Sequence, residues 1–321
     1  MKKELNNFLK EIQKKTAIVI GDIMLDSYLF GDASRNSPEA PVKILNIHQK
    51  KYKIGGAGNV ACNFKKLGVN TLLFGLIGND EKGNKIMSIL KENKISTDGI
   101  IQNTIPTTSK TRLINEANKQ LLRVDEEVIN YRNLNNKKTL IKLIIEKIHL
   151  ADLIIIQDYN KGLLDEEFIK KILLIGQKNN IPIMVDPKEL NFLKYQKVKL
   201  IKPNLLEAEK ILNKKIIIKN TELKKDLKKI QIKLKCEFII ITLGEKGLCM
   251  YGDNTFYREK GIKEQIVDVT GAGDTVICLA SLGFSANLKM HEIAKIANYA
   301  GFLSCLKIGT NSIKNKDLKS L

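Results

Sequence analysis

The chain has 321 residues, of which 43% are hydrophobic and 28% are charged, the balance of an ordinary globular protein. This length allows one large domain or two smaller ones with a substantial core. No apolar run approaches the ~20 residues that a membrane span requires, and residues 1–15 lack the apolar segment of a signal peptide. The five cysteines form no C-x-x-C pair, which indicates reduced thiols and a cytoplasmic location.

The formal net charge is +19, because 54 lysines and arginines outnumber 35 acidic residues. Such an excess is common in nucleic-acid-binding proteins, but here the lysines are spread along predicted helices among acidic and aliphatic residues. Tryptophan is absent and aromatic residues make up 6%, so no base-stacking platform is evident. We therefore expect a solvated basic surface without a nucleic-acid partner, whose field suits an anionic small molecule.

Hydrophobic patterning predicts that helices and strands alternate along most of the chain. Helices are expected at residues 1–15, 55–67, 80–91, 134–150, 165–178, from 205 onward, and 276–284. Strands are expected at residues 16–21, 71–77, 152–157, 181–185, 199–202 and 238–242. These strands are apolar throughout, which is typical of a parallel sheet buried between two helical layers.

Two β-rich segments interrupt this alternation. In residues 26–54, exposed or half-buried strands that include Tyr28 and Phe30 are expected around proline turns. Residues 107–125 form a second, hairpin-like pattern. We interpret both segments as insertions into one domain that form a small separate β layer, a lid.

The stretch from Val267 to Thr275 is the most informative part of the chain. Gly271, Ala272 and Gly273 leave the backbone nearly bare before a long apolar helix, so that their N–H groups can approach an anion at the positive end of the helix. Asp274 follows immediately. An acidic residue at a helix start is also a common cap, but that role does not explain the paired glycines.

Polar residues and glycines follow several predicted strands, at the edge where open α/β sheets bind ligands. They are Asp22, Gly55, Gly56, Asp158, Asp186, Asn204, Glu207, Gly244, Gly247 and residues 271–274. A single such residue is usually a turn former or a cap, whereas the whole set indicates a polar cleft. There is no G-x-x-x-x-G-K-[ST] phosphate loop, no zinc-type spacing and no nucleophile-elbow motif.

Two motifs give the chain a resemblance to the ribokinase-type (PfkB) carbohydrate kinases. One is Gly55-Gly56-Ala57-Gly58-Asn59, and the other is Asp268-Val269-Thr270-Gly271-Ala272-Gly273-Asp274, which matches D-T-x-G-A-G-D with valine in place of threonine. The resemblance covers essentially the whole chain. It implies an α/β, ribokinase-like three-layer αβα sandwich with a mainly parallel central sheet and a small β-sheet lid.

Further segments resemble the D-glycero-β-D-manno-heptose 7-phosphate kinases within that family. They are residues 21–26, 34–42, 120–125, 158–162, 186–188 and 203–207. This narrower resemblance implies phosphorylation of the C1 hydroxyl on the route to ADP-heptose and lipopolysaccharide. Many such kinases are fused to an adenylyltransferase with an H-x-G-H motif, which this sequence lacks, so we expect another protein or segment to perform that step.

The resemblance also implies roles for individual residues on the nucleotide side. Asp274 would be the base, and the N–H groups of Gly271, Ala272 and Gly273 would form an anion hole for the γ-phosphoryl group. ATP and Mg²⁺ are the implied cofactors, with Mg²⁺ held through water by Asn204 and Glu207, and a need for K⁺ is left open. The remaining nucleotide contacts would be Leu205, Leu206, Thr242, Gly244, Gly247 and Asn298.

On the sugar side, Asp22 and Asn59 would hold hydroxyls, and Gly55 and Gly56 would let the sugar lie against the backbone. Further substrate contacts would come from Asp158, Asp186 and Lys188. The phosphate of the sugar would contact cations chosen from Arg35, Lys110, Arg112, Arg123 and Lys161. The lid arginines have an alternative, which is pairing with acidic residues such as Glu39, Asp125 or Glu126.

The resemblance further implies a homodimer formed through the lid. Two other functions stay open. One is a different sugar kinase of this fold, for fructose phosphate, ribose or a nucleoside, and the other is a non-catalytic sugar-binding relative.

Overall fold

The computed structural model describes residues 2–128 and 134–319. Its main element is a nine-stranded sheet with the order β13-β12-β11-β10-β9-β8-β1-β4-β5. The strands are β1 Thr16–Gly21, β4 Asn70–Gly78, β5 Ile100–Asn103, β8 Leu153–Gln157, β9 Ile183–Asp186, β10 Leu200–Ile201, β11 Phe238–Thr242, β12 Leu248–Gly252 and β13 Thr255–Glu259. All pairs from β5 to β11 are parallel, and β12 and β13 add an antiparallel edge. The predicted, mainly parallel sheet is thus confirmed.

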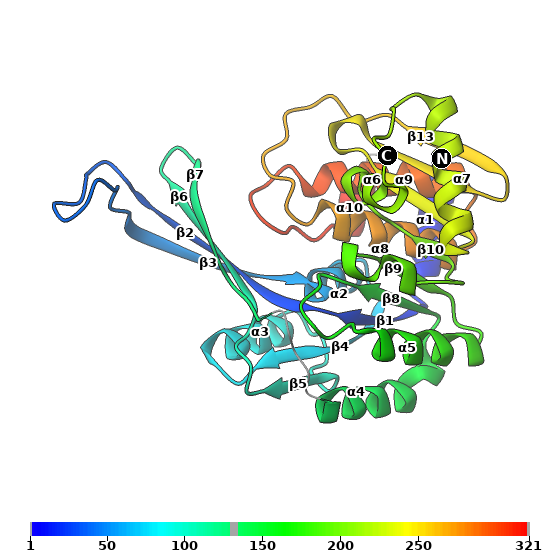
Figure 1. Ribbon diagram of the computed structural model, residues 1–321, viewed down its shortest axis with the longest axis horizontal. Coiled ribbons are helices and arrows are strands. Elements are labelled where there is room, and N and C mark those ends of the chain that lie inside the picture. The colour runs from blue at the N-terminus through cyan, green and yellow to red at the C-terminus, as the bar shows by residue number, and fades with distance from the viewer. Residues whose placement is uncertain (1, 129–133, 320–321) are drawn as a thin grey trace.

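Helices cover both faces of this sheet (Figure 1). They are α1 Lys2–Ile12, α2 Ala57–Lys66, α3 Glu81–Glu92, α4 Leu134–Lys147, α5 Glu166–Lys178, α6 Leu205–Leu212, α7 Asn220–Leu234, α8 Ala272–Ser285, α9 Met290–Ser304 and α10 Asn315–Leu318. Short 3₁₀ turns lie at Ile148–Leu150 (η1), Glu189–Lys194 (η2) and Gly244–Lys246 (η3). No helix in the described part of the chain is both long and apolar enough to cross a membrane.

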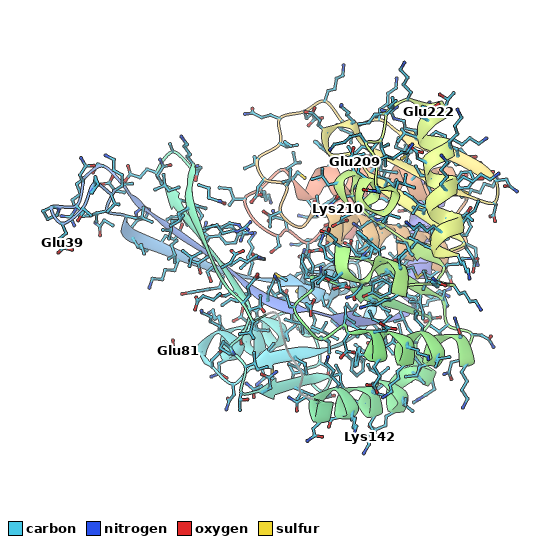
Figure 2. All side chains as sticks on the ribbon, in the orientation of Figure 1. Glu39, Glu81, Lys142, Glu209, Lys210 and Glu222 are labelled. Carbon is cyan, nitrogen blue, oxygen red and sulfur yellow. The ribbon has the colours of Figure 1, made fainter. Side chains whose placement is uncertain are left out.

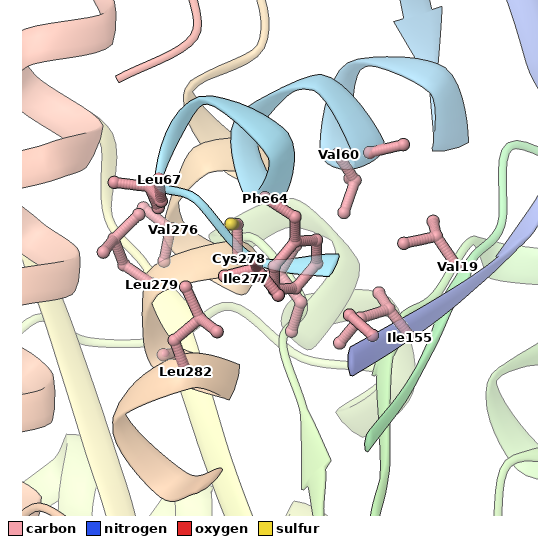
Figure 3. Close-up of a cluster of buried hydrophobic side chains, with 14 of the residues drawn as sticks. Val19, Val60, Phe64, Leu67, Ile155, Val276, Ile277, Cys278, Leu279 and Leu282 are labelled. Carbon is pink, nitrogen blue, oxygen red and sulfur yellow. The ribbon is translucent and has the colours of Figure 1, made fainter. Parts of the chain in front are cut away.

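Successive side chains of β1 point to opposite faces of the sheet, and each face is covered by a layer of helices. Ala17 and Val19 belong to a core with α1, α2, α3, α8 and α9, whereas Ile18 and Ile20 belong to a core with α4 to α7. Figure 3 shows part of the first core, to which Val19 of β1, Phe64 of α2 and Leu279 of α8 contribute. Each such buried aliphatic side chain stabilises the fold by roughly 1.5–3 kcal/mol. The predicted three-layer αβα arrangement is therefore confirmed.

A second sheet of four strands, which we call the lid sheet, has the order β3-β2-β6-β7. Its strands are β2 Ile23–Asp32, β3 Asn46–Gly56, β6 Ser109–Asn115 and β7 Gln120–Glu126. Only Asp22 separates β1 from β2, so the lid sheet grows directly out of the central sheet and projects from the body (Figure 1). Charged side chains are distributed over the whole molecule, from Glu39 at the tip of the lid to Lys142 and Glu222 on the helices (Figure 2).

Three details differ from the sequence-based expectations. Gly55 and Gly56 end β3, and the helix begins only at Ala57, because Gly56 adopts φ 59°, a left-handed conformation that L side chains rarely adopt. Tyr28 was expected to be at least half-exposed, but its side chain is buried against Gly309. The short strands β5, β12 and β13 were not predicted, because single residues such as Gly252 and turns interrupt their patterns.

Candidate active site

The carboxyl ends of four neighbouring strands and the start of α8 meet at one edge of the central sheet. Gly21 at the end of β1 is in register with Gln157 at the end of β8, and Gln157 is in register with Asp186 at the end of β9. Lys202 follows β10, and its ammonium group lies 3.0 Å from the Asp186 carboxylate. This register brings together polar groups that are far apart in the sequence.

The start of α8 approaches these groups with almost bare backbone. Gly271, the N-cap, has φ 81°, and a Cβ there would lie 2.8 Å from Nδ2 of Asn59. A Cβ on Gly273 would lie 3.3 Å from Nζ of Lys202. The Ala272 N–H donates to the Val269 carbonyl at 3.2 Å, whereas helix geometry leaves the N–H groups of Gly273 and Asp274 without an intrahelical acceptor. The helix start and the Lys202 ammonium thus form a positive recess.

Asp274 lies in the first turn of α8 and is buried. Its Oδ2 accepts a hydrogen bond from Nδ2 of Asn59 at 2.7 Å. Its Oδ1 accepts from Nε2 of Gln157 at 3.0 Å and from the Tyr159 hydroxyl at 2.9 Å. Burial raises the pKa of Asp274 to about 7, with Asp186 adding to the rise while Asn59, Tyr159 and Lys202 oppose it. A carboxylate with such a pKa can accept a proton near neutral pH.

Asp22 occupies the junction between β1 and β2. Its Oδ2 accepts from the backbone N–H groups of Tyr159 at 2.8 Å and of Lys161 at 3.1 Å. Burial, followed by the nearby Asp158 carboxylate, raises the pKa of Asp22 to about 7. A small cavity of about 40 Å³ beside it is lined by Gly78, Thr107, Lys161 and neighbouring residues. Asp22 therefore offers a polar contact at the wall of this cavity, and Tyr159, which donates to both carboxylates, links it to Asp274.

A larger pocket of about 170 Å³ lies on the other side of the α8 start. Of the residues predicted for the nucleotide, it is lined by Thr242, Gly244, Gly247 and Asn298, together with Ala272 and Gly273. Its apolar wall contains Val269 of the second motif and residues for which the sequence indicated no role: Ile262, Ile266, Val276, Phe302 and Cys305. The pocket has the apolar wall and few polar groups that a purine ring requires.

Asn204 and Glu207 form a capping box at the start of α6. Oδ1 of Asn204 accepts from the Glu207 N–H at 2.9 Å, and Oε2 of Glu207 accepts from the Asn204 N–H at 2.8 Å. The other carboxylate oxygen of Glu207 pairs with Lys188. Leu205 packs against the core of α4 to α7, whereas Leu206 is exposed. The N-x-x-E pattern thus has a structural role besides any role towards a metal.

Asp158 has three close hydrogen-bond donors inside the protein. The Asn160 N–H, Nδ2 of Asn191 and the Tyr195 hydroxyl all donate to its carboxylate, at 2.6 to 2.8 Å. Its side chain is fully buried. This geometry favours a role in fixing the turn after β8 rather than the substrate contact expected from the sequence.

The lid sheet has two chemically different faces, because side chains alternate along its strands. Residues in register share a face, and two such rows are Lys53-Asp26-Lys110-Asp125 and Lys51-Tyr28-Arg112-Arg123. We call this side the cationic face. It turns toward the body, where Nζ of Lys53 donates to the Ile308 carbonyl at 2.9 Å. A groove of about 540 Å³ separates the cationic face from the body.

Most cations predicted for the sugar phosphate have acidic partners in this structure. Arg112 pairs with the buried Asp26 at 2.6 Å, and Arg123 pairs with Asp125 at 2.9 Å. Lys110 lies 2.8 Å from Asp125, and Lys161 lies 2.5 Å from Glu127. Arg35 is exposed near the tip of the lid. Arg112 and Arg123 therefore pair with acidic residues, which is the alternative expected from the sequence. The sequence did not indicate Asp26 as the partner of Arg112 or Glu127 as the partner of Lys161.

Three polar residues of the site were missed: Gln157, Tyr159 and Lys202. Gln157 and Tyr159 flank Asp158. The expectation that polar residues after strands line the site therefore identified the correct turn but selected Asp158 instead of its two neighbours. Lys202 was placed inside the predicted strand 199–202, whereas β10 ends at Ile201, so that Lys202 lies at the strand end.

Comparison with known proteins adds to this geometry. A profile of the pfkB family carbohydrate kinases matches residues 14–317. The bifunctional protein HldE of Helicobacter pylori strain J99 is 37% identical over 297 residues, which are 92% of this chain and 64% of that protein. The HldE protein of Haemophilus influenzae strain PittEE is 34% identical over 97% of this chain and 64% of that protein. The chain therefore spans a little under two thirds of the length of these relatives.

Solved structures with low sequence identity share the fold. Phosphofructokinase-2 from Escherichia coli in complex with substrates and products superposes with a TM-score of 0.80 at 18% identity, over 95% of this chain and 97% of that chain. Arabidopsis thaliana ribokinase complexed with ribose and ATP gives a TM-score of 0.74 at 15% identity, over 95% and 98%. Together with the match to the family profile, these relatives show that the chain belongs to the pfkB family of carbohydrate kinases, enzymes that transfer a phosphoryl group to a sugar hydroxyl.

Proposed function

We propose that the chain transfers the γ-phosphoryl group of ATP to the C1 hydroxyl of D-glycero-β-D-manno-heptose 7-phosphate. The observation that carries the proposal is the position of Asp274. Its buried carboxylate directly follows Ala272 and Gly273, which line the larger pocket at the start of α8. Through Tyr159 it is also linked to Asp22, which lines the small cavity. A base between a nucleotide pocket and a polar cavity is the arrangement that phosphoryl transfer to a hydroxyl requires.

In the proposed reaction, the sugar hydroxyl oxygen attacks the γ-phosphorus, and Asp274 takes up the hydroxyl proton. The new O–P bond forms as the bond between the γ-phosphorus and the β,γ-bridging oxygen breaks, and ADP leaves with the bonding electron pair. The N–H groups of Gly273 and Asp274 and the Lys202 ammonium lie where negative charge on the transferring group would be stabilised. A single donor of this kind contributes typically ~100- to 1000-fold to kcat.

Mg²⁺ fits the site as a cofactor that keeps most of its water. The described residues contain no group of three or more His, Cys, Asp or Glu side chains that could hold a metal ion. One carboxylate, Glu207, and one amide, Asn204, suit Mg²⁺ that is bound mainly by phosphate oxygens and water, with these two side chains as outer partners. When bound, Mg²⁺ would neutralise phosphate charge. Phosphofructokinase-2 from Escherichia coli has been solved in complex with potassium, and a K⁺ requirement is the corresponding proposal for this chain.

The choice of a sugar phosphate is supported by the HldE relatives and by the cationic face. That face carries Lys51, Lys53, Lys110, Arg112 and Arg123 against only two acidic residues in the same rows, so it retains an excess of positive charge. Because Lys110 and Lys161 both lie close to Glu127, a phosphate at that position would compete with a carboxylate for two ammonium groups. Arg35 would reach the substrate only if the lid closes.

The opposite side of the lid sheet supports a homodimer as a second proposal. The rows Tyr52-Ser27-Thr111-Val124 and Lys50-Leu29-Leu113-Leu122 form this side, which we call the apolar face. Tyr52, Leu122 and Val124 are among the exposed large hydrophobic residues. Exposed apolar side chains gathered on one sheet face are typical of a surface that another protein covers.

The substrate can be tested by measuring ADP release with Mg²⁺, ATP and a panel of acceptors. The panel contains heptose 7-phosphate, fructose 6-phosphate, ribose and adenosine, and Asp274→Asn serves as the inactive control. We expect turnover with heptose 7-phosphate above all others. Preferred turnover of another acceptor would refute the heptose assignment but leave the kinase intact, and a wild-type protein inactive with the entire panel would refute the proposed function.

A further inference from the structure

Gln157 is a buried residue between two carboxylates. It ends β8, between β1 and β9, and its side chain is 1% exposed. Its amide nitrogen Nε2 donates both to Oδ1 of Asp274 at 3.0 Å and to Oδ2 of Asp186 at 3.1 Å. A single amide group therefore ties the proposed base to the acidic residue on the neighbouring strand.

The orientation of this amide is set by the two carboxylates. Turning it over would place Oε1 against two acceptor groups, which would repel it. In the observed orientation, Oε1 is buried and finds no donor within the described residues. A buried carbonyl oxygen without a partner costs stability, so the arrangement satisfies the two carboxylates at the expense of Gln157 itself.

The hydrogen bonds leave Asp274 with one open acceptor position. A carboxylate has about four lone-pair positions, two on each oxygen. Gln157 and Tyr159 occupy those on Oδ1, and Asn59 occupies one on Oδ2. We propose that Gln157 is a positioning residue that fixes the Asp274 carboxylate so that Oδ2 is the atom that receives the substrate proton. This inference rests on the proposed kinase function.

Gln157 also keeps two negative charges apart. Without its N–H groups, the Asp186 and Asp274 carboxylates would face each other, with the ammonium groups of Lys202 and Lys188 as the nearby positive charges. The other ionisable groups around Asp274 are Tyr159 after β8, Lys188 after β9 and Cys278 within α8. Removing Gln157 should therefore disturb Asp274 directly, with little effect on the nucleotide pocket, whose lining does not include it.

The test uses two substitutions of similar size. Gln157→Met keeps the length of the side chain but removes its polar atoms. Gln157→Glu keeps the shape but turns the donor into an oxygen that faces two carboxylates. Ile156→Val, on the same strand, controls for lost packing, since Ile156 points into the other core. Melting temperature and ATP binding show that each variant is folded, and Gln157→Asn replaces Gln157→Met if the latter does not fold.

We expect Gln157→Met to lower kcat about 10- to 100-fold with the KM for ATP unchanged, because a displaced catalytic group loses that much. In the Asp274→Asn background the same change should have almost no further effect, since Gln157 acts through Asp274. Gln157→Glu should move the acidic limb of the rate profile to higher pH, because added negative charge raises the pKa of Asp274.

A Gln157→Met enzyme as active as Ile156→Val would overturn this inference, and so would losses that simply add to those of Asp274→Asn. Either result, obtained with an active wild type and an inactive Asp274→Asn, leaves the proposed function standing. If the wild type phosphorylates no acceptor of the panel, the proposed function fails and the role of Gln157 fails with it.

Discussion

The side-chain amide of Asn59 donates a 2.7 Å hydrogen bond to Oδ2 of Asp274, a residue 215 positions further along the chain. This bond joins the glycine-rich segment after the lid to the start of α8. It stabilises the ionised form of Asp274, since it is the main influence that opposes burial. The contact makes the two family motifs one physical unit.

Replacing Asn59 should therefore change the proton affinity of Asp274. In Asn59→Leu the stabilising donor is lost, so the pKa of Asp274 should rise further above about 7. The acidic limb of kcat/KM should move to higher pH, with the largest loss of activity below neutrality. Rate profiles from pH 5.5 to 9 test this, with Asn63→Leu, one helical turn away, as a packing control. An unchanged acidic limb would contradict it.

Asp274→Asn should abolish most of the activity without unfolding the protein. The variant cannot take up the hydroxyl proton, so kcat should fall at least 1000-fold, which is of the order that general-base catalysis and positioning together supply. ATP binding, followed by titration calorimetry, should stay close to that of the wild type. Turnover within tenfold of the wild type would remove Asp274 from the role of base.

Asp22 should make stability depend on pH in a defined direction. Burial raises the pKa of Asp22 to about 7 from the ordinary 3.8 of an aspartate, so its neutral form is favoured in the folded state. Its contribution is fully present below about pH 4 and is lost as pH rises to about 7. In Asp22→Asn this loss disappears, while an oxygen remains for the N–H groups of Tyr159 and Lys161.

The free energy of unfolding in urea, measured for both proteins at pH 5 and pH 8, tests the Asp22 prediction. Relative to the wild type, the variant should gain stability from pH 5 to pH 8, by about 2.5 kcal/mol if the full shift applies, because part of the effect is already lost at pH 5. If the variant instead loses stability relative to the wild type from pH 5 to pH 8, the folded protein prefers the ionised form of Asp22.

The buried pair of Arg112 and Asp26 should matter more than its exposed neighbour. Arg112→Met removes the hydrogen-bonded guanidinium partner of the buried Asp26 carboxylate and leaves only the more distant Lys53 and Lys110, which should cost about 3–5 kcal/mol. Arg123→Met, on the same face, removes an exposed partner of Asp125 and should cost less than about 1 kcal/mol. Urea unfolding gives both values, and adding Asp26→Asn to Arg112→Met should recover part of the loss. Equal effects of the two arginine variants would contradict the prediction.

The apolar face of the lid sheet should control the oligomeric state. Leu122→Asp places a charge among Tyr52, Leu113 and Val124, so a dimer formed through that face should dissociate. Size-exclusion chromatography with light scattering gives the mass, and Arg123→Met on the cationic face is the control. A Leu122→Asp protein that remains dimeric would place the interface elsewhere.

The sequence predicted six of the nine strands of the central sheet, because these six are short, apolar runs separated by amphipathic helices, and it missed β5, β12 and β13. The strand-end rule also brought Asp22, Asp186 and Asp274 to one edge, as the register requires. It could not foresee that Gln157 and Tyr159, rather than Asp158, would point at Asp274, because that depends on the turn after β8.

The lid shows a second limit of sequence reasoning. Its arginines were considered for a phosphate or for acidic partners such as Asp125, but only the pairing of β2 with β6 reveals that Asp26 lies beside Arg112. The start of α2 was misplaced by two residues because Gly55 and Gly56 continue a strand that a helix pattern obscures. In each case the missing information is a contact between segments distant in the chain.

The single residue between β1 and β2 has a mechanical consequence. Asp22 is anchored to the body by the Tyr159 and Lys161 N–H groups, and β2 leaves it directly for the lid. The residue from which β2 enters the lid sheet is therefore the same residue whose carboxylate lines the small cavity. A ligand that binds Asp22 in this cavity contacts the point where the lid sheet joins the body, so occupancy of the cavity and the angle of the lid sheet are coupled.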